Sequence, residues 1–126
     1  MANNNIKNSN TNENYLNIQD DENEVVLYVV RHGETIFNFK HLIQGWSNAP
    51  LTSNGVEITK QLGKGFESRG INFKSVYISD LARTKETAKN ILLSLTENNL
   101  KLNEDVRLKE GFFGIYEGDV SANMLY

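Results

Sequence analysis

The sequence contains no cysteine and a single proline, Pro50, among its 126 residues. Without cysteine the chain can form no disulfide framework, no thiolate metal site and no cysteine nucleophile. Basic residues are also outnumbered, with 13 Lys and Arg against 16 Asp and Glu, so the net charge is -3. Phosphate backbones and anionic membranes are bound through basic surfaces, so this balance argues against a general nucleic-acid or membrane-surface binder. It does not exclude a local basic pocket.

Long hydrophobic runs are absent too. The longest one covers residues 25–30, far short of the roughly 20 residues that span a bilayer. Residues 1–15 have neither an apolar core nor an Arg-rich amphipathic pattern, so we expect no targeting peptide and a cytoplasmic protein. Nine of the first 23 residues are Asn. Such a segment cannot bury enough surface to offset the entropy of ordering, so we expect a disordered tail over residues 1–23 and a domain over residues 24–126.

Strand and helix patterns alternate after the tail. The β-branched run at residues 25–30 has no polar alternation, which is typical of a strand buried on both faces of a parallel sheet. Residues 74–79 predict a second strand and residues 105–108 a third. Helix patterns cover residues 52–70 and 81–95. This order predicts right-handed crossovers and an α/β fold with a mainly parallel sheet.

Capping residues and apolar spacing define the two predicted helices. Thr52 is a good N-cap for the first helix, and Gly70 supplies its C-terminal stop. The stripe that we expect this helix to bury consists of Ile58, Leu62 and Phe66. Ser79 or Asp80 is expected to cap the second helix. Its expected buried face consists of Leu81, Thr84, Ala88, Ile91 and Leu95.

Residues with chemical potential follow two of the predicted strands. In open α/β sheets, ligands bind beyond the carboxyl ends of the strands, so residues 31–35 and 79–83 are expected to face one crevice. Arg83 falls in the first turn of its helix, where the macrodipole disfavours a cation by about 0.3 to 1 kcal/mol. An anion held between the helix N-terminus and the guanidinium would offset that cost, and phosphate is the usual candidate.

A histidine lies between two further elements of such a site. Arg31 would offer the anion a second planar guanidinium, which can donate two parallel hydrogen bonds. Gly33 lets the backbone approach the anion without a Cβ clash. His32 is then placed as a nucleophile. Its neutral imidazole, with an ordinary pKa near about 6.5, can carry a phosphoryl group covalently.

Four sequence blocks occur in order within residues 25–118. They are Arg31-His32-Gly33-Glu34-Thr35-x-x-Asn38, Gln44-Gly45-Trp46-Ser47-Asn48-Ala49-Pro50-Leu51-Thr52-x-x-Gly55, Ser79-Asp80-Leu81-x-Arg83-x-x-x-Thr87-Ala88 and Leu108-Lys109-Glu110-x-x-x-Gly114-x-Tyr116-Glu117-Gly118. This set resembles the histidine phosphatase superfamily, also called the phosphoglycerate mutase-like family. The resemblance implies a three-layer αβα fold with a mainly parallel sheet.

The resemblance also implies residue roles. His32 would be the phosphohistidine nucleophile, Arg31 and Arg83 would bind phosphate, and Glu110 would protonate the leaving oxygen. The implied substrate-binding set is Arg31, His32, Gly33, Glu34, Thr35, Asn38, Gln44, Gly45 and Arg83. The substrate would be a small phosphomonoester. No metal or cofactor is expected, because two arginines and a helix terminus already neutralise the transferring phosphate.

Residues 110–114 favour one activity over another. The family's cofactor-dependent mutases have Glu-Arg-His-Tyr-Gly here, whereas this chain has Glu-Gly-Phe-Phe-Gly. An apolar pair in place of His and Tyr favours phosphomonoester hydrolysis over mutase chemistry.

A second histidine, which the family has near the C-terminal end of its longer domain, is missing from these 126 residues. We therefore expect a truncated domain with an unpaired strand edge and uncovered apolar surface. Two other interpretations stay open. In the first, the chain is a non-catalytic remnant of the family that binds phospho-ligands. In the second, two chains complete each other's domain as a homodimer.

Several residues carry competing interpretations. Arg83 alone could form a surface salt bridge with Glu86 or Glu110. His41 lies in a loop that the family leaves variable, so a surface role is favoured over a catalytic one. The residues interpreted equally as core packing or as substrate-pocket walls are Trp46, Phe112 and Phe113.

Overall fold

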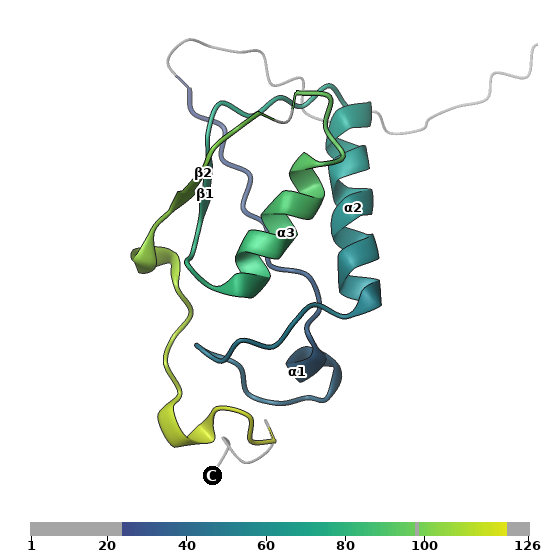
Figure 1. Cartoon of the computed structure of the whole chain (residues 1–126). Helices are drawn as coiled ribbons and strands as arrows, with labels where there is room; N and C mark the ends of the chain where they lie inside the picture. The colour runs from purple at the N-terminus through teal and green to yellow at the C-terminus, as the bar shows by residue number, and fades with distance from the viewer. Residues whose placement is uncertain (1–23, 98, 121–126) are drawn as a thin grey trace, which may run out of the picture.

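The computed structural model describes residues 24–97 and 99–120, which form a small α/β arrangement (Figure 1). Its elements are α1 (Ile36–Phe39), α2 (Ser53–Ser68), β1 (Val76–Ile78), α3 (Ala82–Leu92), β2 (Leu102–Glu104) and the 3-10 helices η1 (Val106–Leu108) and η2 (Gly114–Tyr116). The two strands pair in parallel, with Val76 opposite Leu102 and Ile78 opposite Glu104. The predicted α/β class with a parallel sheet is confirmed. The predicted tail over residues 1–23 lies outside the described residues.

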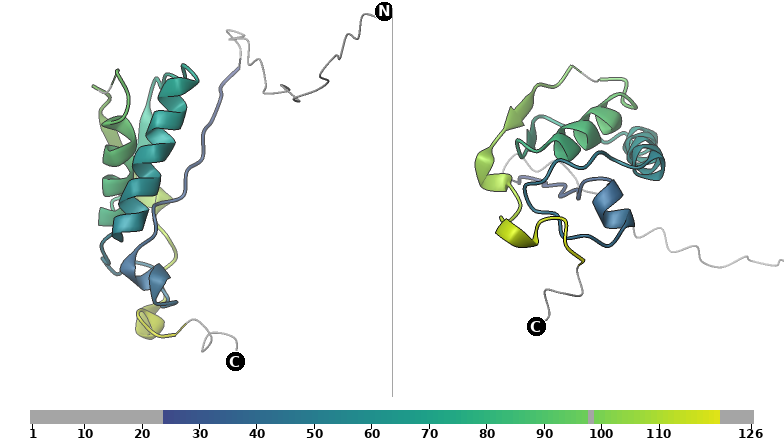
Figure 2. Two further views of the ribbon diagram at one scale, coloured as in Figure 1. Left: turned by 90° about the vertical axis from the view of Figure 1, so that its right-hand side faces the viewer. Right: turned by 60° about the horizontal axis from the view of Figure 1, so that its bottom comes forward.

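The helices α2 and α3 lie side by side (Figure 2). Both begin at the lower end of Figure 1, where β1 also leads into α3 and where α1 and residues 109–120 gather. This end therefore brings the four sequence blocks together. Within the described ranges, no helix is long and apolar enough to cross a membrane.

The helix α2 packs through small residues rather than through the predicted apolar stripe. Ile58 is 52% exposed, and Leu62 and Phe66 are only half-buried. The buried positions are Gly55, Thr59 and Gly63. A Cβ on Gly63 would collide with the carbonyl oxygen of Ile91 in α3. The apolar spacing was misleading because the two helices approach too closely for large side chains between them.

The two predicted helix starts had different outcomes. The Thr52 side chain accepts the N–H of Gly55 at 3.0 Å and caps α2, as predicted. The predicted side-chain cap of α3 is wrong, because the hydroxyl of Ser79 bonds that of Thr84 instead. The residues of the predicted α3 face that are buried are Leu81, Ala88, Ile91 and Leu95, and Thr84 is half-buried.

The second strand of the sheet starts three residues before the predicted third strand. Asp105 still donates its N–H to the carbonyl of Ile78 at 2.8 Å. Its carboxylate then accepts the N–H of Arg107 at 2.9 Å and turns the chain into η1. Residues 105–108 are therefore a cap and a helical turn, not a strand.

The predicted central strand at residues 25–30 is also wrong. Its exposure alternates, with Val25, Leu27 and Val29 between 79% and 92% exposed. The other side carries Tyr28, whose ring meets the edges of Phe66 and Phe73, both at 5.6 Å between centroids. Among the described residues this segment has no ladder partner. A strand is buried on both faces only where layers cover both, so the expected uncovered apolar surface is confirmed here.

Candidate active site

The backbone after the extended segment passes between the two helices. The N–H of Gly33 donates to the Thr87 hydroxyl of α3 at 2.9 Å. A Cβ on Gly33 would lie 2.9 Å from the carbonyl oxygen of Gly55 and 2.9 Å from the Thr59 methyl carbon of α2. Only glycine fits here, and the close fit fixes the direction of the preceding residue, His32.

The ring of His32 is oriented by its own backbone. Its Nδ1 lies 2.8 Å from the carbonyl oxygen of Gly33. A carbonyl can only accept, so Nδ1 carries the proton and Nε2 of the neutral ring keeps a free lone pair. Burial lowers the pKa of His32, the bond to Gly33 opposes this, and the positive charges of Arg83 and Arg31 lower it further. The neutral, nucleophilic form is thereby favoured.

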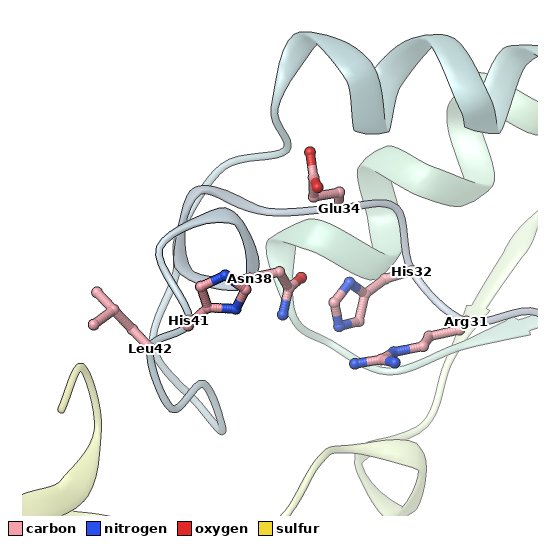
Figure 3. Close-up of a pocket in the computed structure, with 6 residues that line it drawn as sticks. All are labelled: Arg31, His32, Glu34, Asn38, His41 and Leu42. Carbon is pink, nitrogen blue, oxygen red and sulfur yellow. The ribbon is translucent and has the colours of Figure 1, made fainter. Parts of the chain in front are cut away.

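An open cavity of about 440 Å³ lies beside this histidine (Figure 3). In the close-up, Arg31 and His32 point into the same space, and the Asn38 amide faces them from α1. Asn38 uses its oxygen to accept the N–H of Thr35 at 3.0 Å, so its amide nitrogen remains to face the cavity. The lining residues are Arg31, His32, Glu34, Asn38, His41 and Leu42. Guanidinium, imidazole and amide groups together suit an anionic ligand.

Arg83 is not among the residues that line this cavity, and only 2% of its surface is exposed. Its Nη2 donates to the carbonyl of Gly45 at 2.8 Å and its Nη1 to that of Ser47 at 3.3 Å, while its buried Nε has no partner. Burial lowers its pKa, and the carboxylates of Glu110 and Glu117 raise it. In the described ranges no carboxylate lies within salt-bridge distance, so the surface ion pair considered above is not formed.

A family model described as the histidine phosphatase superfamily (branch 1) matches residues 27–125. The chain belongs to this superfamily. A 2,3-bisphosphoglycerate-dependent phosphoglycerate mutase of Afipia carboxidovorans is 34% identical over 93 residues, which cover 74% of this chain and 45% of the relative. A broad-specificity phosphatase of Saccharomyces cerevisiae is 34% identical over 99 residues, covering 79% and 43%. The resemblance drawn from the four blocks is confirmed.

A solved structure supports the same family and fold. The phosphoglycerate mutase of Bacillus anthracis superposes with a TM-score of 0.69 at 42% identity, covering 74% of this chain and 40% of that one. The chain thus spans less than half the length of these relatives. At the family level, its relatives are phosphoglycerate mutases and phosphatases.

In this histidine phosphatase chain, the side chains of Glu34 and Thr35, both predicted to bind substrate, form hydrogen bonds to other residues of the chain. Glu34 lines the cavity, but its carboxylate accepts the Thr52 hydroxyl at 2.6 Å, at the start of α2. Thr35 is completely buried. It caps α1 reciprocally with Asn38, and its hydroxyl lies 2.6 Å from the amide oxygen of Gln44. Thr35 therefore shapes the cavity wall from behind.

Gln44 and Gly45 lie beside the cavity and not on its lining. Gln44 bridges Thr35 and the carbonyl of Ser47, the latter at 3.2 Å. Gly45 offers its N–H to Glu117 and its carbonyl to Arg83. Their polar groups hold the loop over residues 44–47 in place.

Glu110 approaches from the far end of the chain. It is exposed, and its charge raises the pKa of His32, which places the two groups within electrostatic reach. Its backbone carbonyl accepts the indole N–H of Trp46 at 2.8 Å. The neighbouring Lys109 pairs with Asp80 at 2.7 Å and lies 4.5 Å over the Trp46 ring. Trp46 and Phe112 pack on each other at 4.9 Å, and neither is among the residues that line the cavity.

Three residues near the site were not among the predicted site residues: His41, Leu42 and Glu117. His41 and Leu42 line the cavity, although His41 is exposed and was assigned to the surface. The φ of His41 is 56°, a left-handed conformation that no composition pattern signals. Glu117 accepts hydrogen bonds across the loop over residues 44–47. Its place in the fourth block was the one available signal. In residues 24–97 and 99–120, no cluster of three or more His, Asp or Glu could hold a metal ion.

Proposed function

We propose that the chain hydrolyses phosphomonoesters through a phosphohistidine intermediate on His32. The observation that carries this proposal is the bond between Nδ1 of His32 and the carbonyl of Gly33, at 2.8 Å. It leaves Nε2 as the reactive atom, and the lowered pKa of the ring keeps that atom unprotonated near neutral pH.

Two arginines would hold the transferring group. Arg31 lines the cavity, and Arg83 carries a buried Nε–H without a partner. A buried cation that lacks a carboxylate partner is stabilised by a bound anion, so the phosphoryl oxygens would supply what the fold leaves out. The amide nitrogen of Asn38 offers a further donor from α1.

The proposed reaction consists of two phosphoryl transfers, the first to His32 and the second to water. In the first, Nε2 of His32 forms a bond to phosphorus while the ester P–O bond breaks, and the leaving oxygen takes a proton from Glu110. In the second, Glu110 accepts a proton from water as the water oxygen attacks phosphorus, the P–N bond breaks and inorganic phosphate leaves. Protonation of the leaving group is worth roughly 10² to 10⁴ in rate. Charge neutralisation by the arginines needs no metal, so we expect turnover to persist in EDTA.

Mutase chemistry is the second candidate, because relatives named as phosphoglycerate mutases match this chain. Phosphate binding without turnover is the third, because the chain spans less than half the length of those relatives. Hydrolysis is preferred because residues 111–114 carry no side chain able to hold a phosphoglycerate carboxylate, and Phe112 there is exposed and packs on Trp46.

The full chain and its His32→Ala variant test these candidates with p-nitrophenyl phosphate. Turnover that disappears in the variant supports hydrolysis, as does an acid-labile, base-stable phosphoryl group absent from the variant. Phosphate binding without turnover supports the remnant, and transfer between phosphoglycerates supports the mutase. Glu110→Gln separates the roles further. It should slow an alkyl phosphate far more than p-nitrophenyl phosphate, because p-nitrophenolate leaves without a proton.

A further inference from the structure

The carboxylate of Glu117 gathers five hydrogen bonds from two loops. Its Oε1 accepts the backbone N–H of Trp46 at 2.8 Å and that of Phe113 at 3.3 Å. Its Oε2 accepts the N–H of Ser47 at 2.9 Å, the N–H of Gly45 at 3.3 Å and the Ser47 hydroxyl. Three consecutive backbone amides, at residues 45–47, therefore point at a single side chain.

Arg83 binds the backbone carbonyl groups of the same loop. The guanidinium takes the carbonyls of Gly45 and Ser47, while Glu117 takes the amides of those two residues. In the described part of the chain the two charged groups form no direct salt bridge, but the charge of Glu117 raises the pKa of Arg83. The loop is thus clamped between an anion and a cation.

Glu117, Arg83 and the loop at residues 45–47, which together we call the clamp, are closely packed around Gly45. A Cβ there would collide with the carbonyl oxygen of Gly111 and with Oε1 of Glu117, and would lie 2.8 Å from the Phe113 ring. Trp46 continues the contact on the other side, because its indole N–H donates to the carbonyl of Glu110. One carboxylate thereby orders both the support of Arg83 and the segment that carries Glu110.

We propose that Glu117 is a positioning residue of the phosphate site, which fixes the Arg83 guanidinium through the loop at residues 45–47 and Glu110 through Trp46. This inference rests on the proposed function, because it assigns Arg83 to phosphate and Glu110 to the leaving group. Glu117 itself touches neither. Its pKa stays low, about 2, because burial is outweighed by the hydrogen bonds from Ser47, Trp46 and Phe113, so the clamp is ionised at neutral pH.

The variant Glu117→Gln tests the assignment in the full chain. An amide has one acceptor where the carboxylate has two, so at least two N–H donors of the clamp lose their partner. Hydrogen bonds to charged groups are strong enough that we expect the dissociation constant for inorganic phosphate to rise about tenfold or more. The KM for p-nitrophenyl phosphate should rise with it, and kcat for an alkyl phosphate should fall because Glu110 is displaced.

A direct optical readout accompanies the binding assay. Trp46 is the single tryptophan of the chain, so its emission reports whether the loop is docked. We expect a red shift and easier quenching by iodide in Glu117→Gln, with a smaller change in Glu117→Asp, which keeps the charge on a shorter stem.

Glu67→Gln is the matched control. The Glu67 carboxylate also accepts a backbone N–H, that of Thr96 at 3.0 Å, together with the Thr96 hydroxyl. It lies at the C-terminal end of α2, away from the cavity, so phosphate affinity and Trp46 emission should not change. If Glu117→Gln leaves both readouts at their wild-type values, the inference is overturned. If the wild type binds phosphate but never turns over, hydrolysis fails while the phosphate affinity of the Glu117 variants still decides the positioning role.

Discussion

Two regions of this molecule are held together in opposite ways. The helices α2 and α3 meet through small side chains, so closely that a Cβ at Gly63 would strike the carbonyl of Ile91. The loop cluster, which we define as residues 44–47 and 110–117, is held by the charges of Arg83 and Glu117. Most of its aromatic residues stay exposed, among them Trp46 at 48%, whereas Phe113 is half-buried. Burial therefore stabilises the helix pair, whereas directed polar bonds set the geometry of the site.

Arg83 belongs to both regions, so its replacement should have the largest effect. Arg83→Met keeps the stem in α3 and removes the guanidinium. We expect kcat/KM to fall about 100-fold or more, because under the proposed function the variant loses a donor to the transferring phosphoryl group. The free energy of unfolding should fall by about 1 to 3 kcal/mol, because the carbonyls of Gly45 and Ser47 lose their donors. Steady-state kinetics and urea denaturation measure the two quantities.

Arg107→Met is the control for Arg83→Met. Arg107 is exposed and bonds Asp105, and such solvent-screened surface pairs contribute little to stability. Its kinetics should match the wild type. Equal losses of activity in the two variants would show that net charge, and not the position of Arg83, determines phosphate binding.

Two glycines of α2 test the helix pair alone. Gly63→Ala puts a Cβ against α3 and should destabilise the fold by about 1 to 3 kcal/mol through overpacking. Gly65→Ala, two residues along, meets nothing within 4 Å and should stabilise the helix by about 0.5 to 1 kcal/mol. Thermal unfolding measures both. A stabilising Gly63→Ala would mean that a gap large enough for a methyl group separates Gly63 from the Ile91 carbonyl.

The family and the α/β class could be predicted because they depend on the order, along the chain, of the four sequence blocks and of the strand and helix patterns. Thr52 was predictable as a cap for the same reason, since its partner Gly55 is three residues away. The burial of Ile58 was not, because apolar spacing measures only what a helix could bury. Which face α2 buries is decided by Gly63 and the backbone of α3, far along the chain.

The site shows the same division. Arg31 and His32, which are adjacent in the chain, were predicted to share one site, and both line the cavity; their roles in catalysis stay predictions. The sequence had no means of showing that Glu117 bonds loop residues about 70 positions earlier. It also had no means of showing that residues 25–30 find no ladder partner among the described residues, because strand pairing is a property of the neighbours.

Thr52 links the start of α2 to Glu34, which lines the cavity, and its replacement should have a moderate effect. Thr52→Ala removes the bond to the N–H of Gly55 and the 2.6 Å bond to Glu34. Loss of an N-cap costs about 1 kcal/mol, and Thr52→Ser should restore most of it. Urea denaturation of the two variants gives the comparison. If alanine and serine behave alike, the cap bond adds nothing to stability.

The smallest expected effect is a shift in the titration of His32. Burial and the charges of Arg83 and Arg31 lower its pKa in the folded chain, so the unfolded chain binds more protons over the window just below the ordinary value. Stability from this group is therefore fully present above that ordinary value and is lost as the pH falls from there through the lower pKa of the folded chain. NMR titration of the His32 ring should give a lower midpoint in the folded chain than in urea. Arg31→Gln should raise that midpoint, because one of the two positive charges that favour the neutral ring is gone; an unchanged midpoint would mean that Arg31 lies too far from His32 to act on the same phosphate.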